Sequence, residues 1–335
     1  MQTVTIYNMV RRIVYSFMLS GVILLLCACG GKETISTVSK STYDSTALRI
    51  AVFPTLDALP LALANDWGVY DSLGIRVELA VFRSQMEAEK SLADGRADAV
   101  LTDMFRVGWW QWKGKPIRFA FVTRRLLYVV PNKVLRISRV DQLDDRMIAS
   151  TRYSMEDYFT RKVVATIKKR KGQILYPQIN SLELRLSMLM AGQLDAVVLG
   201  LQQTLKARAA GYATLKTEEQ MPDGLAGVAF NTNSLKKKRG MLNKLRNAYD
   251  VAVARLRKMP ALQIDDQTRK ALFLSGEIDS LINVGSDIGV TKVPDVSLKP
   301  MVAEWLRTNA ATAGYTADTL FLASSVGRTD SHSNK

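Results

Sequence analysis

The feature that most constrains the fold is a repeated alternation of short apolar segments with helical patterns. Apolar segments that favour strands lie at residues 48–53, 75–82, 97–102, 117–123, 146–150, 173–179 and 195–199. Caps, breakers and amphipathic stretches typical of helices separate most of them. Strands that alternate with helices indicate parallel or mixed sheets with helices on both faces. The sequence therefore predicts an α/β fold.

One phrase occurs twice in the chain. Residues 92–100 are LADGRADAV and residues 189–197 are LMAGQLDAV, and both fit L-x-x-G-x-x-D-A-V. In each, the glycine can adopt the left-handed conformation that ends a helix, and the next strand begins at Asp-Ala-Val. The phrase indicates two similar lobes; the alternative is a chance match between two ordinary helix-to-strand turns. A chain of 335 residues is long enough for two domains.

The N-terminal segment has the pattern of an export signal. Arg11 and Arg12 precede an uncharged apolar stretch at residues 13–26. This stretch is shorter than the roughly 20 residues of a membrane-spanning helix, so residues 1–28 are predicted to be a signal peptide. Residues 26–29, LCAC, resemble the bacterial lipobox. The resemblance implies cleavage before Cys29 and attachment of acyl chains such as palmitate to it.

Other roles for the two cysteines are weaker. A disulfide between Cys27 and Cys29 would close a strained ring, and a metal site would need more ligands than these two and His332 provide. Residues 30–46 are polar and have no apolar period, which is typical of a flexible spacer. The sequence therefore predicts a tether between a lipid anchor and the fold.

The charge of the chain is strongly positive. Its formal net charge is +15. Nucleic acid is scarce outside the cytoplasm, so the predicted partners are instead an anionic lipid, a cell-surface polymer or an anionic ligand. The clusters KKRK at 168–171 and KKKR at 236–239 are interpreted as solvated helix faces.

Candidate ligand-binding residues follow the strands, because parallel α/β sheets bind ligands at the carboxyl ends of their strands. These residues are Thr55, Leu56 and Asp57; Arg83, Ser84 and Gln85; Thr102, Asp103 and Met104; Thr151, Arg152, Tyr153 and Ser154; and Gly200 and Gln202. Several of these loops have a structural alternative. Asp103 could bind an ammonium group or simply form a turn.

Residues 150–154, STRYS, are the most informative of these loops. They precede a predicted helix, whose first N–H groups and dipole favour an anion. Arg152 could bind a carboxylate, phosphate or sulfonate, and Tyr153 could supply an aromatic wall. A plain N-cap with an exposed arginine is the alternative.

The tryptophans of WWQW, residues 109–112, have two interpretations. Trp109 and Trp112 are spaced for one helix face, which favours core packing over a stacking site. The sequence has few of the residues and motifs that enzymes use for catalysis. The one histidine, His332, lies in the C-terminal tail, and no P-loop, G-x-G-x-x-G, G-x-S-x-G or H-E-x-x-H motif occurs. We expect no enzyme activity, cofactor or metal.

Four segments together carry a family resemblance. They are residues 64–79, ANDWGVYDSLGIRVEL; 92–103, LADGRADAVLTD; 139–154, RVDQLDDRMIASTRYS; and 191–199, AGQLDAVVL. In order and spacing they resemble a type II periplasmic binding protein, of the branch that serves nitrate, sulfonate, taurine or thiamine-pyrimidine importers. The resemblance covers residues 48–232. It departs from the family at GLQQ, 200–203, and at TRR, 123–125, which places two cations near the expected hinge.

The resemblance implies a two-lobed α/β fold with mixed sheets flanked by helices. Lobe 1 is expected at residues 48–124 and 225–323, lobe 2 at 125–224, the lipidated cysteine and tether at 29–47, and a disordered tail at 324–335. The implied function is that of a monomeric, lipid-anchored solute-binding protein in the periplasm or exterior. It would deliver a small anionic or zwitterionic ligand to an ABC permease and its ATPase.

Two alternatives to this function stay open. One is an enzyme on the same fold, for aminopyrimidine synthesis or a chorismate-type dehydration, since fold does not fix function. The other is a sensor or interaction lipoprotein whose lobes bind a partner protein.

Overall fold

The computed structural model describes residues 46–219, 221–238, 240–259 and 263–323, without the side chains of residues 277 and 278. These residues belong to one compact unit. The predicted signal peptide, Cys29, nearly all of the tether and the C-terminal tail with His332 lie outside the described residues.

The described elements alternate as the sequence predicts. The strands are β1 (Leu48–Val52), β2 (Val77–Val81), β3 (Ala99–Asp103), β4 (Ile117–Val122), β5 (Leu127–Pro131), β6 (Ile148–Ala149), β7 (Ala196–Gly200) and β8 (Ala226–Asn231). The helices are α2 (Leu59–Asp66), α3 (Val69–Ser72), α4 (Gln85–Ala93), α5 (Met104–Trp112), α6 (Met155–Ala165), α7 (Leu182–Met190), α8 (Leu201–Ala209), α9 (Thr232–Lys237), α10 (Met241–Arg257), α11 (Asp266–Ala271), α12 (Val284–Asp287) and α13 (Lys299–Asn309).

Short 3₁₀ helices complete the set of described elements. They are η1 (Leu56–Ala58), η2 (Lys133–Leu135), η3 (Val140–Leu143), η4 (Gly276–Leu281) and η5 (Val296–Leu298).

A five-stranded sheet in the order β2-β1-β3-β8-β4 forms the first half of the architecture. β1 pairs in parallel with β2 and β3, whereas β8 is antiparallel to β3 and β4, so the sheet is mixed. Along β1, Leu48, Ile50 and Val52 belong to one hydrophobic cluster, and Ala51 belongs to another. This period of two is what a strand buried on both faces requires.

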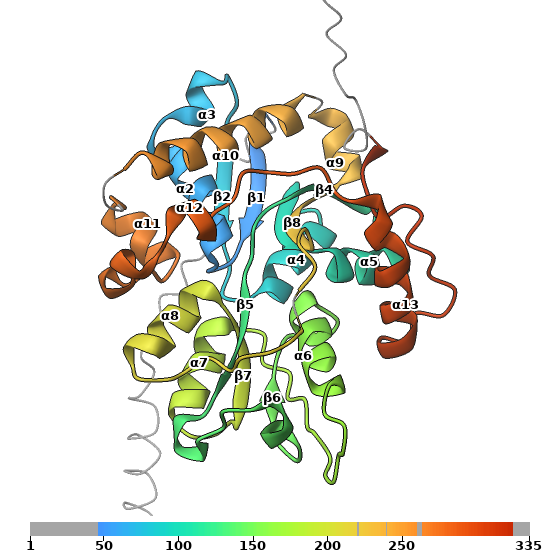
Figure 1. Cartoon of the computed structure of the whole chain (residues 1–335). Helices are drawn as coiled ribbons and strands as arrows, with labels where there is room; N and C mark the ends of the chain where they lie inside the picture. The colour runs from blue at the N-terminus through green and yellow to red at the C-terminus, as the bar shows by residue number, and fades with distance from the viewer. Residues whose placement is uncertain (1–45, 220, 239, 260–262, 324–335) are drawn as a thin grey trace, which may run out of the picture. The chain divides into compact units, whose positions relative to one another are not determined.

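Helices cover both faces of this sheet (Figure 1). α2, α3 and α10 pack together, and α10 contributes Leu245, Tyr249 and Val253 to the cluster that contains Ile50. Buried residues of α4, α5 and α13 belong to the other cluster, which contains Ala51. The predicted α/β class with mixed sheets is therefore confirmed.

A three-stranded sheet in the order β5-β7-β6 forms the second half. β6 is parallel to β7, and β5 is antiparallel to it. Val197 and Leu199 of β7 face the cluster shared with α7, while Ala196 and Val198 face the cluster of α6. We call the part built on the five-stranded sheet lobe 1 and the part built on the three-stranded sheet lobe 2; the residue boundaries given above stay predictions.

Two segments connect the lobes. Residues 123–126 lead from β4 to β5, and residues 210–225 lead from α8 back to β8. Two backbone hydrogen bonds link each crossing to a residue beside the other crossing. Thr123 N donates to Ala226 O at 2.9 Å, and Leu215 N donates to Val129 O at 2.8 Å. They therefore form a paired connection rather than two independent linkers.

The repeated phrase has the same structure in each lobe. Gly95 and Gly192 have φ of 73° and 74°, and the strands that follow begin at Ala99 and Ala196. The aspartate of each copy accepts a hydrogen bond from the adjacent strand region: Asp98 from Arg49 N and Asp195 from Met147 N, both at 2.9 Å. The phrase thus encodes a helix end and a strand anchor together.

Some local predictions were wrong. Residues 173–179 form isolated bridges at Leu175 and Gln178 rather than a strand, because Pro177 has no N–H to continue the ladder. The cluster at 168–171 lies in an exposed loop after α6, not on a helix face. β5 was missed, since it follows the arginines of the first crossing without a break in the sequence pattern.

Candidate ligand-binding site

The carboxyl ends of the central strands in both lobes meet at the contact between the lobes. Arg106 Nη1, in α5 after β3, donates to Arg152 O, after β6, at 3.2 Å. Gln203 Nε2, in α8 after β7, donates to Pro54 O, after β1, at 2.9 Å. The Trp109 and Tyr153 rings stack with their centroids 6.5 Å apart. The strand-end loops predicted to bind ligand therefore face each other.

In lobe 1, side chains of α4, of the end of β3 and of α5 form a buried polar network around Glu89. Gln85 Nε2 donates to Glu89 Oε1 at 3.0 Å and to Asp103 Oδ2 at 2.7 Å. Thr102 Oγ1 donates to Glu89 Oε1 at 2.6 Å, and Arg106 Nε donates to Glu89 Oε2 at 2.8 Å. Because these side chains are almost fully buried, each polar atom needs such a partner.

Asp103 is the titratable group that this network perturbs most. Burial, together with the negative charge of Glu89, raises the pKa of Asp103 to about 6, and hydrogen bonds from Gln85 and from Arg106 N oppose this rise. Asp103 also caps α5 by accepting from Arg106 N at 3.1 Å. Asp103 therefore has a structural role as a helix cap, which differs from the turn-forming alternative.

The loop after β1 is held by the first crossing. Asp57 accepts from Thr123 Oγ1 at 2.8 Å and from Arg125 Nη2 and Nε at 3.0 and 3.2 Å. The Asp57 and Arg125 side chains are 0% and 5% exposed, so this is a buried bidentate pair. One of the two cations noted at residues 123–125 is therefore neutralised within the protein.

In lobe 2, carboxylates of the chain itself accept hydrogen bonds from the backbone of the STRYS loop. Thr151 N donates to Glu156 Oε2 at 3.1 Å, and Tyr153 N donates to Asp157 Oδ2 at 3.0 Å. Ser154 caps α6, and Arg185 pairs with Glu156 at 2.8 Å. Acids in the first turn of a helix complement its dipole in the same way as a bound anion.

The predicted site residues differ in how far their side chains are exposed to solvent and in whether they already have protein partners. Arg83 and Arg152 are exposed at the starts of α4 and α6, and Tyr153 is half-buried with a φ of 58°. The others are buried, in most cases with protein partners: Thr55, Leu56, Asp57, Ser84, Gln85, Thr102, Asp103, Met104, Thr151, Ser154, Gly200 and Gln202. Gln202 Nε2, in α8 of lobe 2, donates to Leu272 O, after α11 of lobe 1, at 2.7 Å.

Four residues that shape this region were missed. Glu89, Arg106, Arg185 and Gln203 are each at most 1% exposed. The available signal was a charged or amide side chain on the apolar face of a helix that begins at a strand end. Gln203 Oε1 and Gln202 Oε1 are buried acceptors without a hydrogen-bond partner among the described residues.

The Trp-rich segment differs in part from the core-packing interpretation. Trp112 is 38% exposed, although its spacing matches that of Trp109. Trp110 Nε1 donates to Glu89 Oε2 at 3.0 Å, so this tryptophan belongs to the polar network. Trp109 is half-buried at the contact between the lobes.

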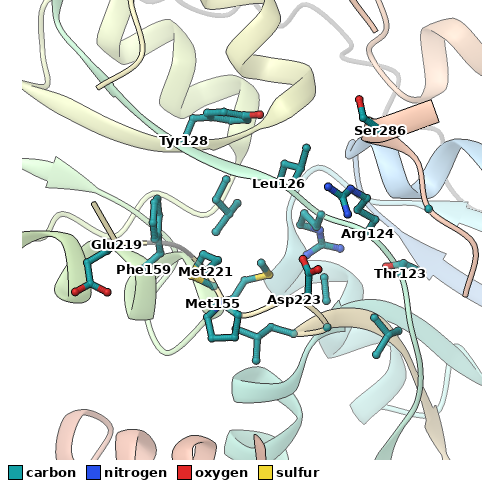
Figure 2. Close-up of a pocket in the computed structure, with 18 of the residues that line it drawn as sticks. Thr123, Arg124, Leu126, Tyr128, Met155, Phe159, Glu219, Met221, Asp223 and Ser286 are labelled. Carbon is teal, nitrogen blue, oxygen red and sulfur yellow. The ribbon is translucent and has the colours of Figure 1, made fainter. Parts of the chain in front are cut away.

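A cavity of about 870 Å³ lies between the two crossings. Its wall includes residues 122–129 around the first crossing and residues 214–217, 219 and 221–226 around the second, with Met155 and Phe159 of α6 and residues near α12 (Figure 2). None of the residues predicted from the strand ends lines it. Arg124 and Arg125, noted in the sequence as cations near the hinge, do line it.

No family model matches the chain, and no curated protein matches it in sequence. Many solved structures are similar, and three of them are described below. The alkanesulfonate-binding protein SsuA from Xanthomonas axonopodis pv. citri, bound to MOPS, has a TM-score of 0.66 at 14% identity, over 84% of this chain and 98% of that one. The ligand-binding component of an ABC-type import system from Staphylococcus aureus, with zinc bound, has a TM-score of 0.65 at 14% identity, over 84% and 97%. The nitrate-binding protein NrtA from Synechocystis PCC 6803 has a TM-score of 0.62 at 13% identity, over 81% and 82%.

The chain has the periplasmic-binding-protein fold. This confirms the fold expected from the four sequence segments. At these identities, fold is what the proteins share.

Metal-binding clusters and membrane-spanning helices are both absent from the described part of this periplasmic-binding-protein fold. Among the described residues, no group of three or more histidine, cysteine, aspartate or glutamate side chains is placed to hold a metal ion. Within the same residues, no helix has the length and apolar character needed to cross a membrane.

Proposed function

We propose that the chain is a lipid-anchored solute-binding protein of an ABC importer, which captures a small anionic or zwitterionic molecule between its lobes. The observation that carries the proposal is the meeting of strand ends from two sheets, through Arg106 and Arg152 and through Gln203 and Pro54. Ligands of α/β sheets bind at such strand ends. The similar structures include proteins named as binding alkanesulfonate and nitrate and one named as the ligand-binding component of an ABC-type import system.

The chemistry available at the strand ends supports this class of ligand. Arg83 and Arg152 are exposed cations beside the starts of α4 and α6, and their guanidinium groups could bind an anion. The buried Gln202 and Gln203 oxygens are acceptors for an ammonium group. A sulfonate, nitrate, carboxylate or thiamine-pyrimidine type of ligand would use these groups after the lobes separate and close again over it.

Export and anchoring complete the proposal. Cleavage before Cys29 and acylation of its thiol would hold the protein at a membrane, facing the periplasm or exterior, where it meets a permease and its ATPase. We expect the mature protein from cells to carry an added lipid mass, and a Cys29→Ser variant to lack it and to leave the membrane fraction. Intact mass spectrometry of both proteins measures this; an unmodified parent protein would contradict the anchor.

The solute is tested by thermal unfolding with sulfonates, nitrate, phosphonates, carboxylates and pyrimidines. We expect one class to raise the melting temperature by a few degrees at saturating concentration. Arg152→Met should weaken that stabilisation, while Lys162→Met, which removes an exposed charge elsewhere on lobe 2, should not. Stabilisation by none of these classes would count against a solute-binding function.

A further inference from the structure

Two backbone hydrogen bonds join the segments on either side of the cavity between the crossings. Thr123 N binds Ala226 O at one end, and Leu215 N binds Val129 O at the other. Between these points, residues 124–128 on one segment and residues 216, 217, 219 and 221–225 on the other line a cavity of about 870 Å³. This volume lies in the range of small-molecule sites, roughly 300–1,000 Å³.

The polar part of the cavity wall is rich in cations that the protein does not neutralise. Within the described ranges, Arg124, Arg257 and Lys292 form no ion pair, and Arg124 Nε is buried without a hydrogen-bond partner. Arg257 Nη2 donates to Ile288 O at 3.2 Å, which orients it but leaves its charge uncompensated. Cations outnumber the lining acids, Glu219 and Asp223.

The remaining wall is apolar and aromatic. Met155 and Phe159 are one turn apart on α6 and buried, and Leu126 comes from the first crossing. In Figure 2, Phe159, Met155 and Met221 lie on one side of the cavity, and Arg124 lies toward the other. A ligand that fills this space therefore needs an apolar body and a negative group at one end.

We propose that this cavity is a second binding site, for an organic anion with an aromatic or aliphatic body, such as an aryl or alkyl sulfonate or carboxylate. The site is distinct from the strand ends, because none of the residues predicted there lines it. Its walls are the crossings on which any movement between the lobes must turn. Occupancy of the site would therefore alter the equilibrium between separated and joined lobes.

The site is tested by titrating the full chain with naphthalene-2-sulfonate in a calorimeter. We expect saturable binding, weakened by roughly tenfold or more in Arg124→Met, because one charge-assisted hydrogen bond is lost. Arg124→Lys should restore part of the affinity. Leu126→Trp, which fills the cavity, should abolish binding, and 2-naphthol, which lacks the sulfonate, should bind weakly to the parent protein. Lys162→Met is the matched charge control and should bind as the parent does.

Variants at the strand ends distinguish binding in the cavity from binding at the strand-end site. Arg83→Met and Arg152→Met should leave naphthalene-2-sulfonate binding unchanged, whatever they do to the small solutes. Equal binding by the parent, Arg124→Met and Leu126→Trp would place the probe elsewhere and overturn the proposal. Absence of binding at millimolar probe would also overturn it. Thermal unfolding of each variant verifies its fold, and Arg124→Met supports the conclusion without Leu126→Trp if the latter is unstable.

Discussion

At the scale of single residues, buried charges explain why most of the predicted site residues are bonded to other protein groups. Arg106 and Arg185 are the two largest fully buried side chains, and each pairs with one glutamate, Glu89 in lobe 1 and Glu156 in lobe 2. A buried charge without a partner is strongly destabilising. The surrounding loops therefore donate to these glutamates rather than to solvent, and they form the two polar networks behind the strand ends.

The network of lobe 1 predicts a pH dependence of stability. The pKa of Asp103 is raised from 3.8 to about 6 in the folded protein. As pH rises from about 4 to about 6, the unfolded chain loses this proton before the folded protein does. The contribution of Asp103 to the free energy of unfolding should therefore fall across this window, and it should be fully present only below about pH 4.

Asp103→Asn removes this titration. We expect the parent protein to lose stability relative to the variant between about pH 4 and 6, with Glu89, Arg106 and Gln85 as the groups that face the carboxyl. Urea unfolding at several pH values measures the difference. Asp71→Asn, at an exposed carboxylate, is the control. Parallel pH profiles for the parent and Asp103→Asn would show that Asp103 titrates normally.

At the scale of elements, short-range signals were sufficient where the partner is near in sequence. Ser84 and Ser154 cap α4 and α6, as their positions before helical patterns suggested. The glycines of the repeated phrase adopt positive φ and end α4 and α7 near the predicted residues. These features depend only on the conformational preferences of a few consecutive residues.

Elements that depend on distant pairing were harder to predict. β5 is antiparallel to β7, some 70 residues later in the chain. Residues 173–179 have strand composition, but Pro177 limits their pairing with the region of β6 to isolated bridges. For both segments, the local residue pattern favours an extended conformation. Whether the segment forms the hydrogen bonds of a β-sheet depends on the backbone that lies beside it.

At the scale of the whole molecule, the lobes are joined by more than their two crossings. The stack between Trp109 and Tyr153 lies beside the hydrogen bond from Arg106 to Arg152 O. Phe105 of α5 also stacks on Tyr158 of α6, with ring centroids 4.9 Å apart. Separation of the lobes for ligand entry must break these contacts, so their strength sets part of the cost of opening.

A double-mutant cycle with Trp109→Ala and Tyr153→Ala measures one of these contacts. We expect a coupling free energy of about 1 kcal/mol, the usual value for an aromatic pair. Urea unfolding of the parent, both single variants and the double variant gives the coupling. A cycle on Tyr153 and the exposed Lys162, which lies more than two helical turns away on α6, serves as the control. Zero coupling between Trp109 and Tyr153 would mean that the lobes do not meet there in solution.

The sequence by itself determined the α/β class, the repeated helix-to-strand turn, the helix caps and the choice of strand ends as candidate sites. Each follows from residue preferences within a few positions of the chain. Tertiary structure alone decided which polar groups remain available. Gln203 reaches Pro54 across 149 residues, and Arg125 neutralises Asp57 across 68. The cavity between the crossings also arises from segments far apart in sequence. Buried polar groups form hydrogen bonds with residues that are close in space, whatever their distance in the sequence. Only the packed fold therefore determines which residues become partners.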